Sequence, residues 1–174
     1  DRSIRPHGLC FGYLGRIEPS KGADMLLSAC SQLPEGGWNL TIGGRAPCGI
    51  DSYRRQAGNM PVTFLGQVDA DSFYERIDCL IVPACWPEAF GRTVSEALLR
   101  GIPVIGSDIG GVGEQLRAWD AGSLFPPGDV DALAALMNKA VSGDLPVTVA
   151  DRPDMRRRMA IATVADAYAE QYSL

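Results

Sequence analysis

Short apolar runs alternate with segments of helical periodicity along this chain, and this alternation limits the folds that it can adopt. The apolar runs have the length of strands and are followed by glycine or proline, whereas the intervening segments repeat apolar residues at helical spacing. Such alternation is typical of a parallel sheet with helices on both faces. We therefore expect one α/β domain over 1–174, with a Rossmann-like, doubly wound parallel sheet of about six strands. The pattern predicts strands at 9–14, 38–42, 62–65, 79–82, 104–106 and 123–125, and helices at 23–33, 53–57, 72–77, 92–100, 111–116, 130–141 and 155–172.

The composition narrows the range of partners. A hydrophobic fraction of 46% suits a globular protein, and a net charge of −5 argues against a nucleic-acid-binding surface. The longest apolar stretch, 79–86, is far shorter than the ~20 residues that cross a bilayer. The five cysteines form no C-x-x-C pair, and the single histidine is His7. We therefore expect no membrane segment, no disulfide framework and no metal site, and we place the protein in the reducing cytoplasm.

Two acidic pairs precede predicted helices. Asp69 and Asp71 form a D-x-D pattern, which binds metal in some enzymes, and Asp129 and Asp131 are spaced in the same way. Each pair stands where a helix begins, and an aspartate at that position accepts a hydrogen bond from a free backbone amide. Helix capping therefore explains both pairs better than metal binding.

Glu88 and Glu96 are the most informative polar residues. Glu88 lies in a loop after the apolar run 79–82, and Glu96 lies near the start of the helix predicted at 92–100. Ligands of open α/β sheets bind at the carboxyl ends of the strands, and the unpaired amides of a helix start bind phosphate well. A carboxylate one turn further along accepts hydrogen bonds from sugar hydroxyls. The pair therefore indicates a site for a phosphate-linked sugar.

The same segment resembles the glutamate-x-seven-glutamate motif of retaining glycosyltransferases of family 4, in the glycosyl transferases group 1, which have the two-domain GT-B fold. Further blocks agree with this family in order and spacing, so the resemblance extends over residues 8–142. It identifies the chain as the carboxyl-terminal, donor-binding half of such an enzyme. The supporting blocks are a phosphate loop at 15–22, a strand and turn at 40–44, a strand at 62–66, and the segments 101–108 and 110–114 that follow the motif.

The resemblance assigns roles to individual residues. Arg16 and Lys21 would stabilise the departing diphosphate, Glu88 would orient the donor sugar, and Glu96 would bind the ribose. Backbone groups would make the remaining nucleotide contacts, at Gly44, Val68, Gly91, Arg92, Thr93 and Val94. From the residues alone, Arg16 and Lys21 fit solvated loop cations better than phosphate ligands. The glycine pair at 43–44 fits a simple turn as well as a close approach to a ligand. No cofactor or metal is implied, because an arginine and a lysine can neutralise a diphosphate.

The implied reaction is the retaining transfer of a hexose from a nucleoside-diphosphate sugar to an acceptor hydroxyl. The acceptor site would lie on an amino-terminal domain that this sequence lacks, and a terminal helix in 151–174 would pack on that domain. We therefore expect the chain to be inactive alone. An epimerase or phosphorylase of the same fold, or a non-catalytic nucleotide-binding module, are the alternatives. The nucleobase, the sugar, the acceptor and the linkage stay open.

Overall fold

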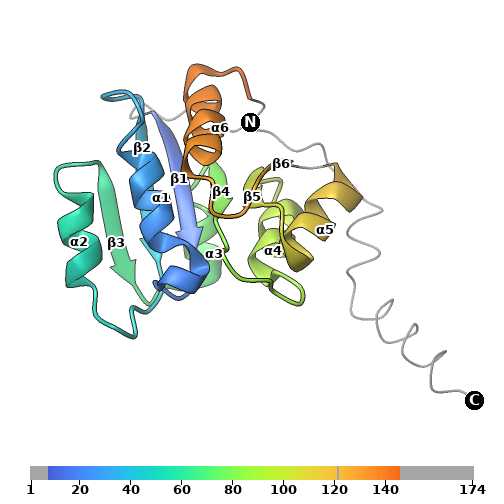
Figure 1. Cartoon of the computed structure of the whole chain (residues 1–174), viewed down its shortest axis with the longest axis horizontal. Coiled ribbons are helices and arrows are strands. Elements are labelled where there is room, and N and C mark those ends of the chain that lie inside the picture. Colours follow the sequence, from blue (N-terminus) through green and yellow to red (C-terminus); the bar gives the residue numbers. More distant parts are fainter. Residues whose placement is uncertain (1–7, 121, 146–174) are drawn as a thin grey trace, which may run out of the picture.

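The structure is a computed structural model that describes residues 8–120 and 122–145. Within these residues, six strands form one sheet in the order β3-β2-β1-β4-β5-β6, and every neighbouring pair is parallel (Figure 1). This confirms the predicted fold class. The strands are β1 (Leu9–Leu14), β2 (Trp38–Gly43), β3 (Val62–Gly66), β4 (Cys79–Val82), β5 (Val104–Ser107) and β6 (Gly122–Phe125).

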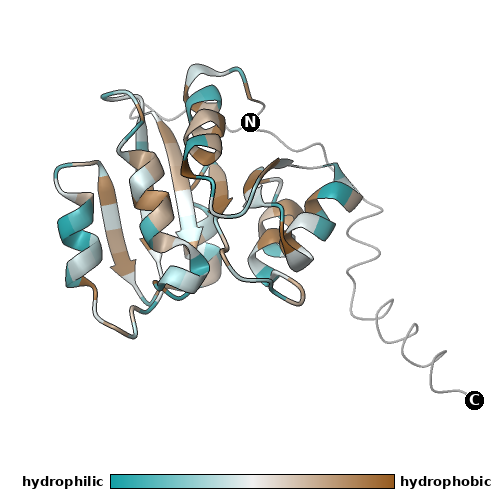
Figure 2. Cartoon of the chain, viewed as in Figure 1, coloured by the Kyte–Doolittle hydropathy of each residue, from teal (hydrophilic) through white to brown (hydrophobic). Residues whose placement is uncertain are grey.

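Helices cover both faces of the sheet. Successive strand residues point to opposite faces, so Phe11 and Ile81 join one hydrophobic core while Cys10 and Leu80 join the other. Helices α1 (Ala23–Cys30), α2 (Asp51–Ala57) and α6 (Val130–Ser142) complete the first core, and α3 (Ala70–Tyr74), α4 (Arg92–Leu99) and α5 (Gly110–Trp119) complete the second. Figure 2 shows hydrophobic residues concentrated on the strands, whereas α2 carries many hydrophilic ones. The sheet is therefore doubly wound.

Most element boundaries agree with the sequence pattern, and the differences have local causes. The helix expected at 72–77 is α3, which begins at Ala70 because Asp69 caps it, accepting a hydrogen bond from the Ser72 amide at 3.0 Å. Asp129 caps α6 in the same way, through the amide of Ala132 at 2.9 Å. The capping interpretation of these two aspartates is confirmed. A short 3₁₀ helix, η1 (Pro19–Lys21), was not predicted, and the helix expected at 155–172 lies outside the described residues.

The strand order reverses between β1 and β4. The chain proceeds from β1 to β2 and β3 on one side, and from β4 to β5 and β6 on the other. The loops that leave the carboxyl ends of β1 and β4 lie against each other, since the Cys85 amide donates to the Ser20 carbonyl at 3.1 Å. This is the switch point at which open α/β sheets bind ligands. Among the described residues, no helix is both long and apolar enough to cross a membrane.

Candidate nucleotide-sugar site

A cavity of about 380 Å³ opens at the switch point between β1 and β4. Its walls come from the loop after β1 and from the loop that joins β4 to the start of α4. The cavity brings together six of the residues expected at the site: Arg16, Lys21, Glu88, Gly91, Arg92 and Thr93.

Lys21 and Glu88 form an ion pair across this cavity. The Lys21 ammonium donates to Oε1 of Glu88 at 2.7 Å, and both side chains are about three-quarters buried, with 27% and 26% of their surfaces exposed. The pair joins η1 to the loop after β4, at the boundary between the two halves of the sheet. A fixed cation and a fixed carboxylate therefore face one space that is large enough for a ligand.

Arg16 is more exposed than Lys21. Its guanidinium pairs with Glu18 at 3.1 Å, and 63% of its side chain is exposed. The loop beneath it is held by Tyr13, whose hydroxyl donates to the Arg16 carbonyl at 2.6 Å. Burial is the largest cause that raises the pKa of Tyr13 above its usual value, so this hydroxyl remains a donor at neutral pH. Tyr13 gave no signal in the sequence, because an aromatic residue at the end of a strand is usually part of the core.

The start of α4 presents backbone amides to the cavity. Gly91 is the N-cap, with φ of +69°, and the amides of Arg92 and Thr93 follow in the first turn. The first amides of a helix lack partners within the helix and bind anions. Val94 differs, because its amide already donates to the Gly91 carbonyl at 3.0 Å and its side chain is buried.

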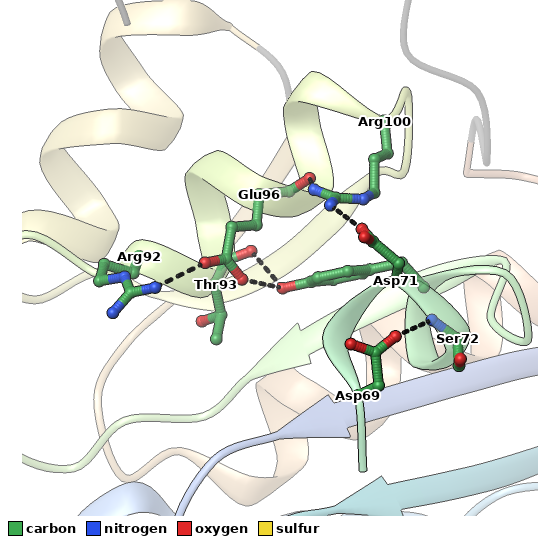
Figure 3. A network of polar contacts seen from close by, with 8 residues as sticks. Asp69, Asp71, Ser72, Arg92, Thr93, Glu96 and Arg100 are labelled. Carbon is green, nitrogen blue, oxygen red and sulfur yellow. Dashed lines mark hydrogen bonds and ion pairs between the residues drawn. The ribbon is translucent and has the colours of Figure 1, made fainter. Parts of the chain in front are cut away.

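Glu96 lies beside the cavity, next to the lining residues Arg92 and Thr93. Its Oε1 accepts from Arg92 at 3.2 Å, and its Oε2 accepts from the buried hydroxyl of Tyr74 at 3.1 Å (Figure 3). Both oxygens of the carboxylate thus have a donor within the protein. Its side chain keeps 28% of its surface exposed, which leaves it accessible to a ligand.

Gly44 and Val68 lie away from the lining of this cavity. Gly44 lines a neighbouring cavity of about 760 Å³, together with Arg45 and Gln67, at the carboxyl ends of β2 and β3. A Cβ atom on Gly44 would overlap the Gly15 carbonyl oxygen, and its φ is +140°. Val68 packs against the core that α3, α4 and α5 complete, and it lies close to Gly43. The geometry at Gly44 therefore gives it a structural role whether or not it contacts a ligand.

The two aspartates of the D-x-D pattern point to different partners. Asp69 caps α3, whereas Asp71 pairs with Arg100 of the segment after α4 (Figure 3). Within 8–120 and 122–145, no group of three or more histidine, cysteine or acidic side chains is arranged to hold a metal ion.

Comparison with known proteins assigns the family. The family described as glycosyl transferases group 1 matches residues 4–163, which is most of the chain. The chain belongs to this glycosyltransferase family. The resemblance noted in the sequence is thereby confirmed at the level of the group and of its GT-B-type fold.

Relatives of this glycosyltransferase domain are considerably longer than the chain. A phosphatidyl-myo-inositol mannosyltransferase of Mycobacterium leprae is 36% identical over 141 residues, which are 74% of this chain and 37% of that protein. A D-inositol 3-phosphate glycosyltransferase of Mycobacterium marinum is 30% identical over 146 residues, which are 78% of this chain and 31% of that protein. The chain therefore spans about a third of these two curated relatives.

Among solved structures, Anabaena HepE in complex with UDP superposes with a TM-score of 0.84 at 27% identity, covering 96% of this chain and 49% of HepE. HepE has also been solved with UDP-glucose, with a TM-score of 0.82 at 26% identity, covering 95% of this chain and 49% of HepE. The glycosyltransferase domain thus has the fold of one half of that protein.

In this glycosyltransferase domain, α5 fixes the loop that carries Glu88. The buried side chain of Gln115 accepts a hydrogen bond from the Ser95 hydroxyl at 2.6 Å and donates to the carbonyl groups of Phe90 and Gly91. The Gly111 amide also donates to the Glu88 carbonyl, at 2.8 Å. Gln115 and Ser95 could not be predicted from the sequence, because their polar atoms meet only when α4 packs on α5.

We expect Gln115→Ala to destabilise the glycosyltransferase domain by about 1–3 kcal/mol, because it removes the side-chain partner of the buried Ser95 hydroxyl and of the Phe90 carbonyl. Urea unfolding measures this loss. Gln56→Ala is the matched control, since the exposed Gln56 also donates two hydrogen bonds, to the Asp24 carbonyl and the Ser28 hydroxyl. Equal losses in the two variants would contradict the role of Gln115 in holding the loop.

Proposed function

We propose that this chain is the donor-binding domain of a retaining glycosyltransferase of family 4, which transfers a hexose from a nucleoside-diphosphate sugar to an acceptor hydroxyl. The observation that carries the proposal is the 2.7 Å ion pair between Lys21 and Glu88 across the switch-point cavity. It places a cation suited to a diphosphate beside a carboxylate suited to sugar hydroxyls, and the start of α4 borders the same cavity.

The diphosphate would lie between the loop after β1 and the start of α4. Lys21 and Arg16 supply two positive charges there, and the amides of Gly91, Arg92 and Thr93 supply neutral donors. As the bond to the sugar breaks, negative charge grows on the leaving diphosphate, and these groups stabilise it without a metal or a cofactor. Arg16 is exposed enough to turn from Glu18 toward the ligand.

The sugar and the nucleoside would lie on either side of the diphosphate. A phosphate that takes the place of Glu88 beside Lys21 frees the Glu88 carboxylate to accept hydrogen bonds from hexose hydroxyls. Glu96 would accept from the ribose hydroxyls, and the base would extend past Gly44 and Val68 at the ends of β2 and β3. UDP and UDP-glucose in the complexes of HepE support uridine as the nucleoside.

The acceptor would bind to an amino-terminal domain, with the segment 151–174 packing across to it. This arrangement is supported by the chain's span of about half the length of HepE. We accordingly expect this chain alone to bind the donor without transferring sugar. A cytoplasmic location is supported by the five cysteines, which are all free thiols.

Isothermal titration of the chain with UDP, GDP and ADP, each with and without magnesium, tests the proposal. We expect UDP to bind about tenfold or more tightly than the other two nucleotides, with no requirement for metal. Binding that depends on magnesium would contradict the metal-free site. Failure of all three nucleotides to bind would contradict the donor-binding role.

The alternatives differ in the fate of the bound donor. An epimerase would convert UDP-glucose to another UDP-sugar without an acceptor, and a phosphorylase would need inorganic phosphate. A non-catalytic module would bind the nucleotide but would neither transfer nor hydrolyse the sugar when joined to its amino-terminal domain. Chromatography of UDP-sugars after incubation with the full-length protein distinguishes these outcomes from transfer.

A further inference from the structure

We propose that Tyr74 is a positioning residue that holds the Glu96 carboxylate in the orientation that binds the ribose of the donor. The inference rests on the proposed function, in which Glu96 is the ribose ligand. It concerns a residue of α3, which contributes no side chain to the cavity of the Lys21–Glu88 pair.

The hydroxyl of Tyr74 connects α3 to the first turns of α4. It donates to Oε2 of Glu96 at 3.1 Å and also lies 3.2 Å from the Thr93 carbonyl oxygen, so one buried proton is shared between two acceptors (Figure 3). Tyr74 is only 1% exposed, and burial is the largest cause that raises the pKa of its hydroxyl above the usual value. The hydroxyl is therefore a permanent donor at neutral pH.

The ring of Tyr74 is fixed from two sides. The ring of Phe73 meets it edge-on with centroids 5.7 Å apart, and the guanidinium of Arg100 lies 4.8 Å from the Tyr74 centroid. Arg100 in turn pairs with Asp71 and donates to the backbone carbonyl of Glu96 at 2.9 Å. The donor and the backbone of its acceptor are thus held by the same group of residues, which limits how far the carboxylate can rotate.

The two oxygens of Glu96 differ in the donors that hold them. Tyr74 contacts Oε2 from the core, whereas Oε1 pairs with Arg92, whose side chain is 85% exposed and lines the cavity. Exposed ion pairs four residues apart in a helix contribute little stability. A ribose hydroxyl can therefore replace Arg92 on Oε1 while Tyr74 keeps Oε2 in place. Because the carboxylate is already ordered, nucleotide binding does not include the entropic cost of ordering it.

The test compares UDP with 2′,3′-dideoxy-UDP by titration calorimetry, because only UDP offers ribose hydroxyls to Glu96. We expect Tyr74→Phe to weaken UDP binding by about 3- to 10-fold and to change the affinity for the dideoxy analogue by less than about twofold. The phenylalanine keeps the packed ring, and unchanged binding of the analogue reports an intact site. Tyr53→Phe is the matched control, since it changes a buried tyrosine of the other core, and it should alter neither affinity.

A double variant tests whether Tyr74 acts through Glu96. In a Glu96→Gln background, Tyr74→Phe should weaken UDP binding by less than about twofold, because the oriented carboxylate is already lost. The positioning role would be overturned if Tyr74→Phe bound UDP as tightly as the wild type does. It would also be overturned if the variant lost affinity for UDP and for the dideoxy analogue by the same factor. A wild type that binds both ligands equally well would instead overturn the proposed role of Glu96, so the two failures are distinguishable.

Discussion

Lys21→Ala is expected to weaken UDP binding by about 30- to 100-fold, or roughly 2–3 kcal/mol. The substitution would remove the charge-assisted contact that we propose between Lys21 and the diphosphate. It also leaves the Glu88 carboxylate, which pairs with Lys21 at 2.7 Å, as an unneutralised negative charge beside an anionic ligand. Both effects act in the same direction, so the loss should exceed that for an isolated surface lysine. Titration calorimetry at fixed ionic strength measures it.

Two further variants separate these effects. Lys139→Ala removes the same charge from the exposed side of α6 and should change the affinity for UDP by less than about twofold, because α6 contributes no residue to the lining of the cavity and salt screens an exposed charge. In a Lys21→Ala background, Glu88→Gln should restore part of the lost affinity, since it removes the uncompensated charge. If Lys21→Ala binds UDP as tightly as Lys139→Ala does, Lys21 is wrongly assigned to the diphosphate.

The fold could be predicted from the sequence because the central strands, such as β1 and β4, are short, apolar and buried. Residues such as Phe11 and Leu80 are fully buried although they face opposite layers, and a strand that is covered on both faces needs an unbroken apolar run. The ends of the helices were less predictable where a capping contact or a packing contact sets them. The two additional residues at the start of α3 depend on the bond between Asp69 and Ser72, and the extent of α5 depends on burial of Trp119 against its core.

The charged residues of the candidate site could be predicted from the sequence, but the residues that they contact could not. Lys21 and Glu88 stand out in the sequence by their motifs, but they are 67 positions apart, and only the approach of the loops after β1 and β4 pairs them. Tyr74 and Gln115 gave no signal, because each occupies an apolar face of its helix and only its polar tip reaches a neighbouring element. Contacts of this kind depend on how helices pack, which local periodicity does not encode.

We expect Gly44→Ala to destabilise the domain by about 3 kcal/mol or more. Gly44 has φ of +140°, a conformation that side-chain-bearing residues rarely adopt, and a Cβ at this position would overlap the carbonyl oxygen and carbon of Gly15. Neither backbone can retreat easily, because the Gly15 amide donates to the Gly43 carbonyl at 3.0 Å and the Gly44 amide donates to the Gly66 carbonyl at 2.7 Å. Urea unfolding followed by tryptophan fluorescence measures the loss.

Gly36→Ala separates the steric overlap from the backbone strain. Gly36 also has a positive φ, of +80°, but a Cβ there would meet no atom within 4 Å, so we expect a loss of only about 1–2 kcal/mol. The difference between the two variants then reports the close approach of the loop after β2 to the loop after β1. Because that approach shapes the wall beside Arg16, Gly44→Ala should also weaken UDP binding under conditions in which the protein is still folded. A Gly44 variant that is no less stable than the Gly36 variant would show that the two loops can separate at little cost.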